Sequence, residues 1–268
     1  MNILVTNDDG ISSPGLMALA EAMSNIGEVC VLAPDKDWSG RGHVKTLNEP
    51  LRIYETKLES GFKAFASNGA PSDCVALGLL GYFSHDFGIV VSGINPAPNL
   101  GHDVTYSGTV TAAMEAAIWG VPGIAYSLDS SEKNYHVIDY QSAAIVAEII
   151  TNNVLTSGLP RGVLLNVNIP MGIIKGIQIT HQGMRVYRDQ LEERYDPRGN
   201  PYYWIGGDAP TGIPEEGTDI GALDMGFVSL TPLQLDLTSY EMINKLKNWQ
   251  QDYNFPIHEL ETRTNGRS

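Results

Sequence analysis

Short apolar segments alternate with helical patterns along the first 170 residues of this 268-residue chain. These segments are rich in β-branched residues and lack polar alternation, which is typical of strands buried on both faces of a sheet. The predicted strands are 2–6, 28–33, 51–56, 62–66, 87–91, 123–128 and 163–168, and helices are predicted at about 15–26, 68–80, 107–119 and 140–152. This alternation predicts an α/β fold with a Rossmann-like, doubly wound and mostly parallel sheet.

The pattern changes after Pro170, which divides the chain into a predicted core, 1–170, and a C-terminal region, 171–268. A strand at 175–182 precedes a hairpin at about 184–206, and a last helix is predicted at 240–250 before a loose tail at 261–268. An isolated hairpin is barely stable in water. We therefore expect this hairpin and the terminal helix to serve in oligomerisation, with a lid on the chain's own core as the alternative.

Two adjacent carboxylates, Asp8 and Asp9, follow the first predicted strand, and Gly10 allows the chain to turn there. Ligands of open α/β sheets bind outside the carboxyl ends of the strands. Two like charges this close repel each other unless a cation lies between them. The alternative is a polar turn in which the carboxylates only cap the following helix.

Three further loops follow predicted strands, so the fold would bring them to the same edge. The loop containing Ser39 and Gly40 is rich in glycine, which lets backbone N–H groups approach an anion. Asn95 offers a neutral oxygen after a buried strand, although turn asparagines commonly do so. Ser107-Gly108-Thr109 begins a helix whose N-terminus favours a phosphate, and an ordinary N-cap is the alternative.

Carboxylates, a hydroxyl and an amide oxygen are hard ligands, which suit Mg²⁺ or Mn²⁺. The formal net charge is −14, so the surface repels nucleic-acid polymers and anionic membranes. A phosphorylated small molecule would also be repelled, and it would need a cation or N–H donors to bind. Cys30 and Cys74 lie in apolar stretches, there is no signal-peptide pattern, and we expect a cytoplasmic protein.

Motifs along nearly the whole chain resemble one known family. They are Val5-Thr6-Asn7-Asp8-Asp9-Gly10-Ile11 with Pro14-Gly15, Ser39-Gly40-Arg41-Gly42-His43 with Glu49-Pro50-Leu51-Arg52, Asn68-Gly69-Ala70-Pro71-Ser72-Asp73-Cys74-Val75, Ser92-Gly93-Ile94-Asn95, Asn99-Leu100-Gly101 with Val104-Thr105-Tyr106-Ser107-Gly108-Thr109-Val110, Leu165-Asn166-Val167-Asn168, Asp196-Pro197-Arg198-Gly199 and Ser229-Leu230-Thr231-Pro232-Leu233. This set, in this order, resembles the SurE family, the stationary-phase survival proteins that act as nucleoside monophosphate phosphatases.

The resemblance implies a site and an assembly. It implies one divalent cation per subunit, Mg²⁺ or Mn²⁺ with Ca²⁺ as a substitute in crystals, and metal ligands Asp8, Asp9, Ser39 and Asn95. It implies phosphate or substrate contacts at Gly40, Asn99, Ser107, Gly108 and Thr109. It also implies a cytoplasmic homodimer or homotetramer that exchanges C-terminal elements.

We therefore predict a metal-dependent phosphomonoesterase in which Asp8 and Asp9 are catalytic and a metal-activated water attacks phosphorus. Its substrates would be nucleoside 5′-monophosphates, with 3′-monophosphates and short-chain polyphosphate as further candidates. His43 and His102 are candidate acids for the leaving group. A catalytically silent nucleotide or phosphate binder is the main alternative. An aspartyl-phosphate enzyme would need Asp-x-Asp after the first strand, and a nicotinamide dehydrogenase would need Gly-x-Gly-x-x-Gly there; the chain has neither.

Overall fold

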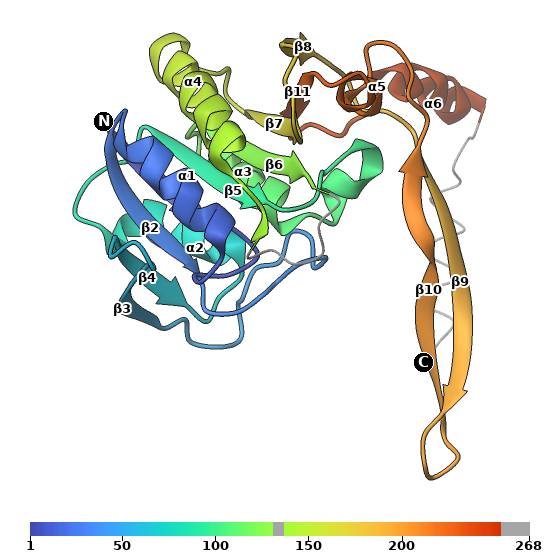
Figure 1. Ribbon diagram of the computed structural model, residues 1–268. Coiled ribbons are helices and arrows are strands. Elements are labelled where there is room, and N and C mark those ends of the chain that lie inside the picture. The colour runs from blue at the N-terminus through green and yellow to red at the C-terminus, as the bar shows by residue number, and fades with distance from the viewer. Residues whose placement is uncertain (131–136, 253–268) are drawn as a thin grey trace, which may run out of the picture. The chain divides into compact units, whose positions relative to one another are not determined.

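The computed structural model describes residues 1–130 and 137–252, and within them nine strands form one sheet (Figure 1). In sheet order the strands are β3 (Ile53–Lys57), β4 (Lys63–Ser67), β2 (Glu28–Pro34), β1 (Asn2–Thr6), β5 (Ile89–Asn95), β6 (Gly123–Asp129), β7 (Val163–Pro170), β11 (Val228–Gln234) and β8 (Ile177–Ile179). The tail predicted at 261–268 lies outside the described residues.

The strands from β4 to β7 run parallel, and β1 lies between β2 and β5 at the centre of the sheet. Only β3 and β11 run antiparallel to neighbouring strands, namely β4 and β7. The predicted α/β fold with a mostly parallel sheet is therefore confirmed. The carboxyl ends of the parallel strands share one edge, so the loops that follow them gather there.

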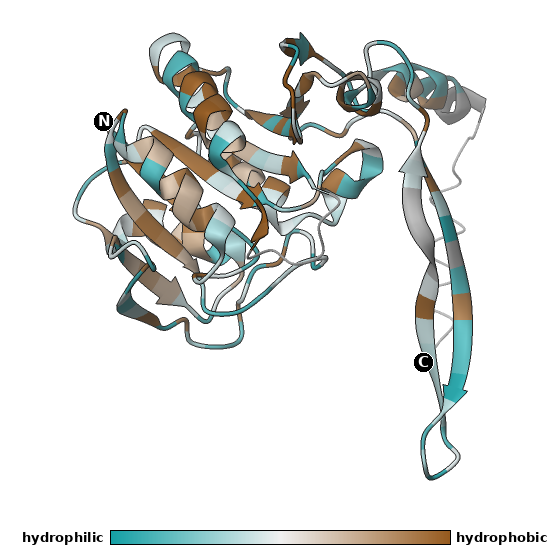
Figure 2. Cartoon of the chain, viewed as in Figure 1, coloured by the Kyte–Doolittle hydropathy of each residue, from teal (hydrophilic) through white to brown (hydrophobic). Residues whose placement is uncertain are grey.

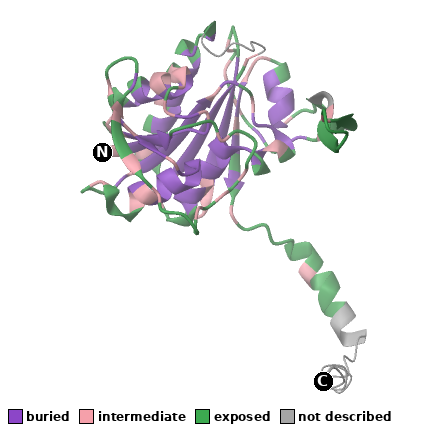
Figure 3. Ribbon diagram, turned by 90° about the horizontal axis from the view of Figure 1, so that it is seen from below, coloured by how far each residue is buried: buried purple, intermediate pink, exposed green. Residues whose placement is uncertain are grey.

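Helices cover both faces of the sheet. They are α1 (Pro14–Ser24), α2 (Pro71–Leu77), α3 (Gly108–Ile118), α4 (Gln141–Ser157) and α5 (Asp219–Asp224), with a short π-helix, η1 (Gly78–Tyr82), and a 3₁₀ helix, η2 (Gly101–Thr105). Ile3 and Val5 pack with α1 and α4, whereas Leu4 packs with α2 and α3, as the alternation of side chains along β1 requires. Figure 2 shows hydrophobic residues along these strands, and Figure 3 shows that the strands are buried.

One predicted boundary is wrong. The predicted strand 87–91 ends at Val91, whereas β5 continues to Asn95. Ser92 pairs with Thr6 of β1, and Asn95 pairs with Ser127 of β6 after a shift in register. Pairing with strands on both sides overrides the weak local preference of a Ser-Gly sequence.

The predicted hairpin consists of β9 (Arg185–Tyr195) and β10 (Pro201–Gly212), which pair antiparallel with each other. Its arms are longer than expected, and the Asp196 carboxylate accepts hydrogen bonds from the N–H groups of Arg198 and Asn200 in the turn. Neither arm joins the nine-stranded sheet (Figure 1). β8 is shorter than the predicted strand at 175–182.

The chain divides into two compact units, Met1–Leu235 and Asp236–Ser268. The described part of the second unit contains α6 (Tyr240–Asp252), close to the predicted helix at 240–250. No helix within the described residues is both long enough and apolar enough to cross a lipid bilayer.

Candidate functional site

The polypeptide turns sharply where β1 ends. The side-chain amide of Asn7 donates a 3.0 Å hydrogen bond to the carbonyl of Gly10, which closes the turn around Asp8 and Asp9. Gly10 has φ +97°, and a Cβ there would lie 3.1 Å from the carbonyl carbon of Lys36. Only glycine meets both demands without strain. The two carboxylates are thus held at the edge of the sheet by a closed turn.

Asp8 lies against the start of α3. Its side chain is buried, and Oδ1 accepts a 2.5 Å hydrogen bond from the hydroxyl of Thr109, 101 residues away in sequence. A Cβ on Gly108 would lie only 2.5 Å from the Cβ of Asp8. Burial raises the pKa of Asp8, and the hydrogen bond from Thr109 opposes that rise. The structure therefore places a carboxylate directly against a helix N-terminus.

Asp9 completes the acidic pair. Burial, followed by the charges of Asp8 and Asp37, raises the pKa of Asp9 to about 8. Its buried Oδ2 has no hydrogen-bond partner within the described residues. A buried carboxylate oxygen without a donor is costly unless a cation compensates its charge.

Asp37 is a member of the site that the sequence reasoning missed. Its Oδ1 accepts hydrogen bonds from the N–H of Ser39, at 2.7 Å, and from the hydroxyl of Ser39, at 2.5 Å. The N–H of Trp38 donates to the carbonyl of Asp8 at 2.8 Å, which brings this loop against the acidic turn. An Asp two residues before a Ser is a common turn-forming pattern and was the only available signal.

The glycines of the same loop have two different environments. Gly40 is exposed with φ +72°, and a Cβ there would meet no atom within 4 Å. Gly42 is fixed to the segment before α3, because its N–H donates a 2.9 Å hydrogen bond to the carbonyl of Tyr106 and its carbonyl accepts one from Thr111. The loop is thus anchored at Gly42 and open at Gly40.

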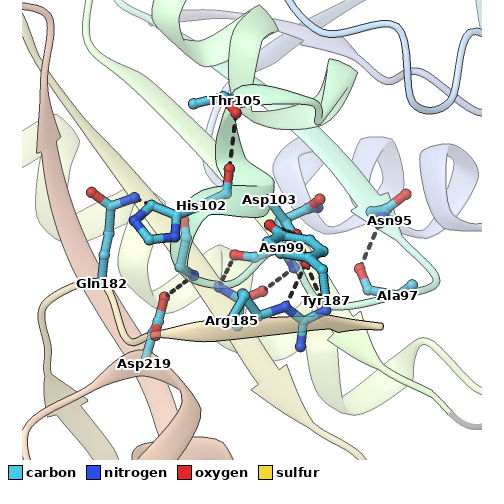
Figure 4. Close-up of polar contacts among 12 residues, drawn as sticks. Asn95, Ala97, Asn99, His102, Asp103, Thr105, Gln182, Arg185, Tyr187 and Asp219 are labelled. Atoms are coloured by element: carbon cyan, nitrogen blue, oxygen red, sulfur yellow. Dashed lines mark hydrogen bonds and ion pairs between the residues drawn. The ribbon is translucent and has the colours of Figure 1, made fainter. Parts of the chain in front are cut away.

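Asn95 and Asn99 take different roles. The Asn95 amide nitrogen donates a 2.5 Å hydrogen bond to the carbonyl of Ala97 (Figure 4). This bond leaves its side-chain oxygen without a donor from the described chain. Asn99 is held to the sheet, since its amide nitrogen donates to Ser127 at 2.8 Å and its N–H donates to Asn168 at 2.7 Å. Asn95 is therefore free to bind a ligand, whereas the contacts of Asn99 position the loop.

Ser107 caps α3: its hydroxyl oxygen accepts a 3.1 Å hydrogen bond from the N–H of Val110. The N–H of Thr109 donates to the carboxylate of Asp8, so in the first helical turn the N–H of Gly108 is left for another anion. This N–H and the helix dipole favour negative charge. The Thr109 contact with Asp8 places this anion-binding terminus beside the acidic pair.

The donor set fits a small divalent cation. Asp8 and Asp9 would supply charge to a cation, Ser39 and Asn95 would supply neutral oxygens, and Oδ2 of Asp9 has no partner among the described residues. Nowhere in the described chain do three or more His, Cys, Asp or Glu side chains gather into a metal-holding group. Two carboxylates with neutral oxygens suit Mg²⁺ or Mn²⁺, which retain water ligands, better than Zn²⁺.

The side chain of His43 is hydrogen-bonded to Glu115 on α3. The Nε2–Oε2 distance is 2.9 Å, and Lys45 and Trp119 donate to Oε1 at 3.1 and 2.8 Å. Burial alone would raise the pKa of Glu115, but the hydrogen bonds from these three residues outweigh it and lower the pKa to about 2. The imidazole of His43 thus secures its loop to α3. His102, the other candidate acid, has an exposed side chain.

We expect Glu115→Gln to destabilise the protein by about 1–3 kcal/mol at pH 6–7, because three donors lose a charged acceptor. The folded-state pKa lies below the ordinary 4.5, so this stabilisation is complete above pH 4.5 and fades as the pH falls towards 2. Urea unfolding at pH 6 and pH 3 measures the change. The control is Glu55→Gln, whose partner Lys63 is exposed, with an expected loss below about 0.5 kcal/mol. A pH-independent loss for Glu115→Gln would contradict the expectation.

Comparisons with known proteins place this chain among related sequences. The sequence profile of the family described as "Survival protein SurE" matches residues 3–189. A protein of Chloroflexus aggregans named "5'-nucleotidase SurE" is 48% identical over 253 residues, covering 93% of this chain and 99% of the relative. "5'-nucleotidase SurE 1" of Thermus thermophilus is 49% identical, covering 92% of this chain and 96% of the relative.

The fold also matches a solved structure. The crystal structure of the SurE protein from Aquifex aeolicus superposes with a TM-score of 0.78 at 42% sequence identity, covering 93% of this chain and all of that one. The profile, the relatives and the fold agree, and the resemblance seen in the sequence is confirmed. This chain belongs to the SurE family.

Proposed function

We propose that this chain is a divalent-metal-dependent 5′-nucleotidase, which hydrolyses nucleoside 5′-monophosphates to nucleoside and phosphate. The observation that carries the proposal is the 2.5 Å hydrogen bond from Thr109 to Asp8. It joins an anion-binding helix terminus to a pair of carboxylates that needs a cation. A phosphate ester that reaches this edge would have donors on one side and a cation on the other.

The residues around the turn at Asp8 and Asp9 would have separate roles in binding the substrate. The N–H of Gly108 would bind a non-bridging phosphate oxygen, and the helix dipole would stabilise negative charge on it; the N–H of Thr109 already donates to the carboxylate of Asp8. The open backbone at Gly40 lets the ester approach the loop that carries Ser39. Asn99 keeps the intervening segment on the sheet through Ser127.

Asp8, Asp9, Ser39 and Asn95 would hold the cation. A bound Mg²⁺ or Mn²⁺ supplies Lewis acidity and a water of lowered pKa. Asp9 is the better proton acceptor of the pair, because its Oδ2 is unpartnered while Oδ1 of Asp8 already accepts from Thr109. The named activity of the relatives in Chloroflexus aggregans and Thermus thermophilus supports the substrate class.

We further propose that the C-terminal region, 171–268, forms the contacts of a homodimer or homotetramer. The hairpin exposes large apolar side chains: Trp204 is 58% exposed and Ile205 is 82% exposed. An exposed apolar ribbon of this kind is stabilised when another surface covers it. Analytical ultracentrifugation of the whole chain and of Trp204→Ser/Ile205→Ser tests this, and unchanged association of the variant would contradict it.

A phosphate-release assay on the purified chain tests the activity. The panel pairs Mg²⁺, Mn²⁺, Ca²⁺ and chelator with nucleoside 5′-monophosphates, 3′-monophosphates and short-chain polyphosphate. We expect turnover of 5′-monophosphates that the chelator abolishes and Mn²⁺ or Mg²⁺ restores. The 3′-monophosphates and polyphosphate are included because the helix terminus recognises phosphate and not the sugar position.

The same assay decides against the alternative. A silent nucleotide or phosphate binder would bind a nucleoside monophosphate in calorimetry and release no phosphate with any of these cations. That result would overturn the proposed activity and would leave the anion site in place. Turnover that is undiminished in chelator would overturn the metal dependence.

A further inference from the structure

Residues at the start of the hairpin form hydrogen bonds with η2, the segment that precedes the N-terminus of α3. We call residues 182–187 the hairpin base. Nε and Nη2 of Arg185 both lie 2.6 Å from Oδ2 of Asp103 on η2, and the hydroxyl of Tyr187 donates to Oδ1 of the same carboxylate at 2.6 Å (Figure 4). Both carboxylate oxygens of Asp103 are therefore occupied by the hairpin base.

The backbone of Asp103 continues this connection to the site. Its carbonyl accepts hydrogen bonds from the N–H groups of Tyr106, at 2.9 Å, and Ser107, at 3.2 Å. Ser107 is the N-cap of α3, and Thr109 in the first turn contacts Asp8. A single residue thus joins the hairpin base, through its side chain, to the phosphate-binding terminus, through its backbone.

A second contact holds the first residue of η2. Asp219, fully buried at the start of α5, accepts hydrogen bonds of 2.7 Å from the N–H of Gly101 and from the N–H of Gly183 in the hairpin base (Figure 4). A Cβ on Gly101 would lie 2.4 Å from the carbonyl oxygen of Gly183, so the two backbones touch. The η2 segment is therefore held by the C-terminal region at its first residue and at its middle residue.

The chemistry of the Asp103 contact suits a rigid support. The two nitrogens of Arg185 and the phenol of Tyr187 fix the carboxylate from two directions. Burial and the neighbouring Asp103 raise the pKa of Tyr187 to about 12, so the phenol stays a donor across the physiological range. Arg185 and Asp103 are largely shielded, with side chains 13% and 20% exposed.

We propose that Arg185 and Tyr187 are positioning residues of this enzyme: by holding the Asp103 carboxylate they set the place of Ser107 and of the N–H group that binds phosphate. The inference rests on the proposed function and adds to it a role for the hairpin base. The hairpin base would then position the phosphate-binding residues, in addition to the role proposed for the C-terminal region in oligomer contacts. Neither Arg185 nor Tyr187 contacts Asp8 or Asp9, and the acidic pair is reached from the hairpin base only through the contact between Thr109 and Asp8.

The test compares Tyr187→Phe and Arg185→Lys in the whole chain with matched controls on the same hairpin. Phenylalanine removes only the hydroxyl, and lysine keeps the charge while losing the guanidinium fork. The controls are Tyr195→Phe and Arg194→Lys, which break exposed contacts with Glu193 and Glu192 farther along β9. Inorganic phosphate is the probe, measured by calorimetry with Mn²⁺ present and as a competitive inhibitor of turnover.

We expect the KM for a nucleoside 5′-monophosphate, and the Kd and Ki of phosphate, to rise about 3- to 10-fold in both test variants. The value of kcat should stay within about a factor of two of wild type. The rise in melting temperature on adding Mn²⁺ should be unchanged, and both controls should behave as wild type. Tyr187→Phe should add little to Asp103→Asn, because the two substitutions break the same contact.

Several results would overturn the inference. Unchanged phosphate affinity with a lowered melting temperature would show that the contacts are only structural. An equal loss in Tyr195→Phe would show a general effect of the hairpin. If the wild-type chain releases no phosphate, the proposed activity fails, but the calorimetric Kd still judges the positioning role. A wild-type chain that binds no phosphate overturns that role as well.

Discussion

Asp8→Asn should lower the rate of phosphate release by more than about 100-fold. Even the loss of a residue that only hydrogen-bonds to a metal ligand lowers metal affinity or activity by about 10- to 100-fold. Asparagine keeps the shape of the side chain and an oxygen that can accept from Thr109, so the turn should remain intact. What it removes is a negative charge that the cation needs. Turnover of a nucleoside 5′-monophosphate with Mn²⁺ measures the loss.

Thermal unfolding gives this prediction a readout besides activity. At a Mn²⁺ concentration about 100 times its Kd, the wild-type chain should gain about 2.7 kcal/mol of stability, and Asp8→Asn should lose most of this gain. Without the cation, Asp8→Asn should be at least as stable as wild type, because Asp8, Asp9 and Asp37 repel one another. Asp86→Asn, an exposed substitution with the same change in charge, should change neither quantity. A full Mn²⁺ response in Asp8→Asn would remove Asp8 from the cation site.

Gly108→Ala should abolish most activity by displacing Asp8. Alanine is favoured over glycine in a helix by up to about 1 kcal/mol, so helix propensity alone predicts a more stable protein. In this structure the new Cβ would lie 2.5 Å from the Cβ and 2.8 Å from Oδ2 of Asp8, and one of the two must move. A displacement near 1 Å at a reacting centre costs about 100-fold, and we expect a loss of kcat/KM of that size.

A matched glycine substitution separates this effect from a general loss of stability. Gly158 at the end of α4 has φ +73°, and a Cβ there would meet no atom within 4 Å. Gly158→Ala should cost about 1–3 kcal/mol through backbone strain and leave kcat/KM unchanged. Gly108→Ala should instead lose most of its kcat/KM and most of the stability that the wild-type chain gains on adding Mn²⁺. Wild-type kcat/KM in Gly108→Ala would contradict the close contact between α3 and Asp8.

Much of the site could be predicted because its parts are local in sequence. Asp8 and Asp9 follow an apolar strand, and Ser107 precedes a helical pattern, so a parallel sheet must bring both to one edge. The contacts between these parts could not be predicted. Glu115 and His43 are 72 residues apart, and no periodicity or turn signal links them. Asp37 could not be singled out either, because its contacts with Ser39 form only when the loop takes its path in the folded chain.

The sequence by itself determined the alternation of strands and helices, the acidic turn at Asp8 and Asp9, and the family, because each is encoded in neighbouring residues. Only the tertiary structure decided that Thr109 reaches Asp8, that β5 continues to Asn95, and that Arg185 holds Asp103 across 82 residues. The physical reason is that these contacts depend on how separate elements pack. Packing is set by the shapes and charges of many side chains together and by no single stretch of the chain.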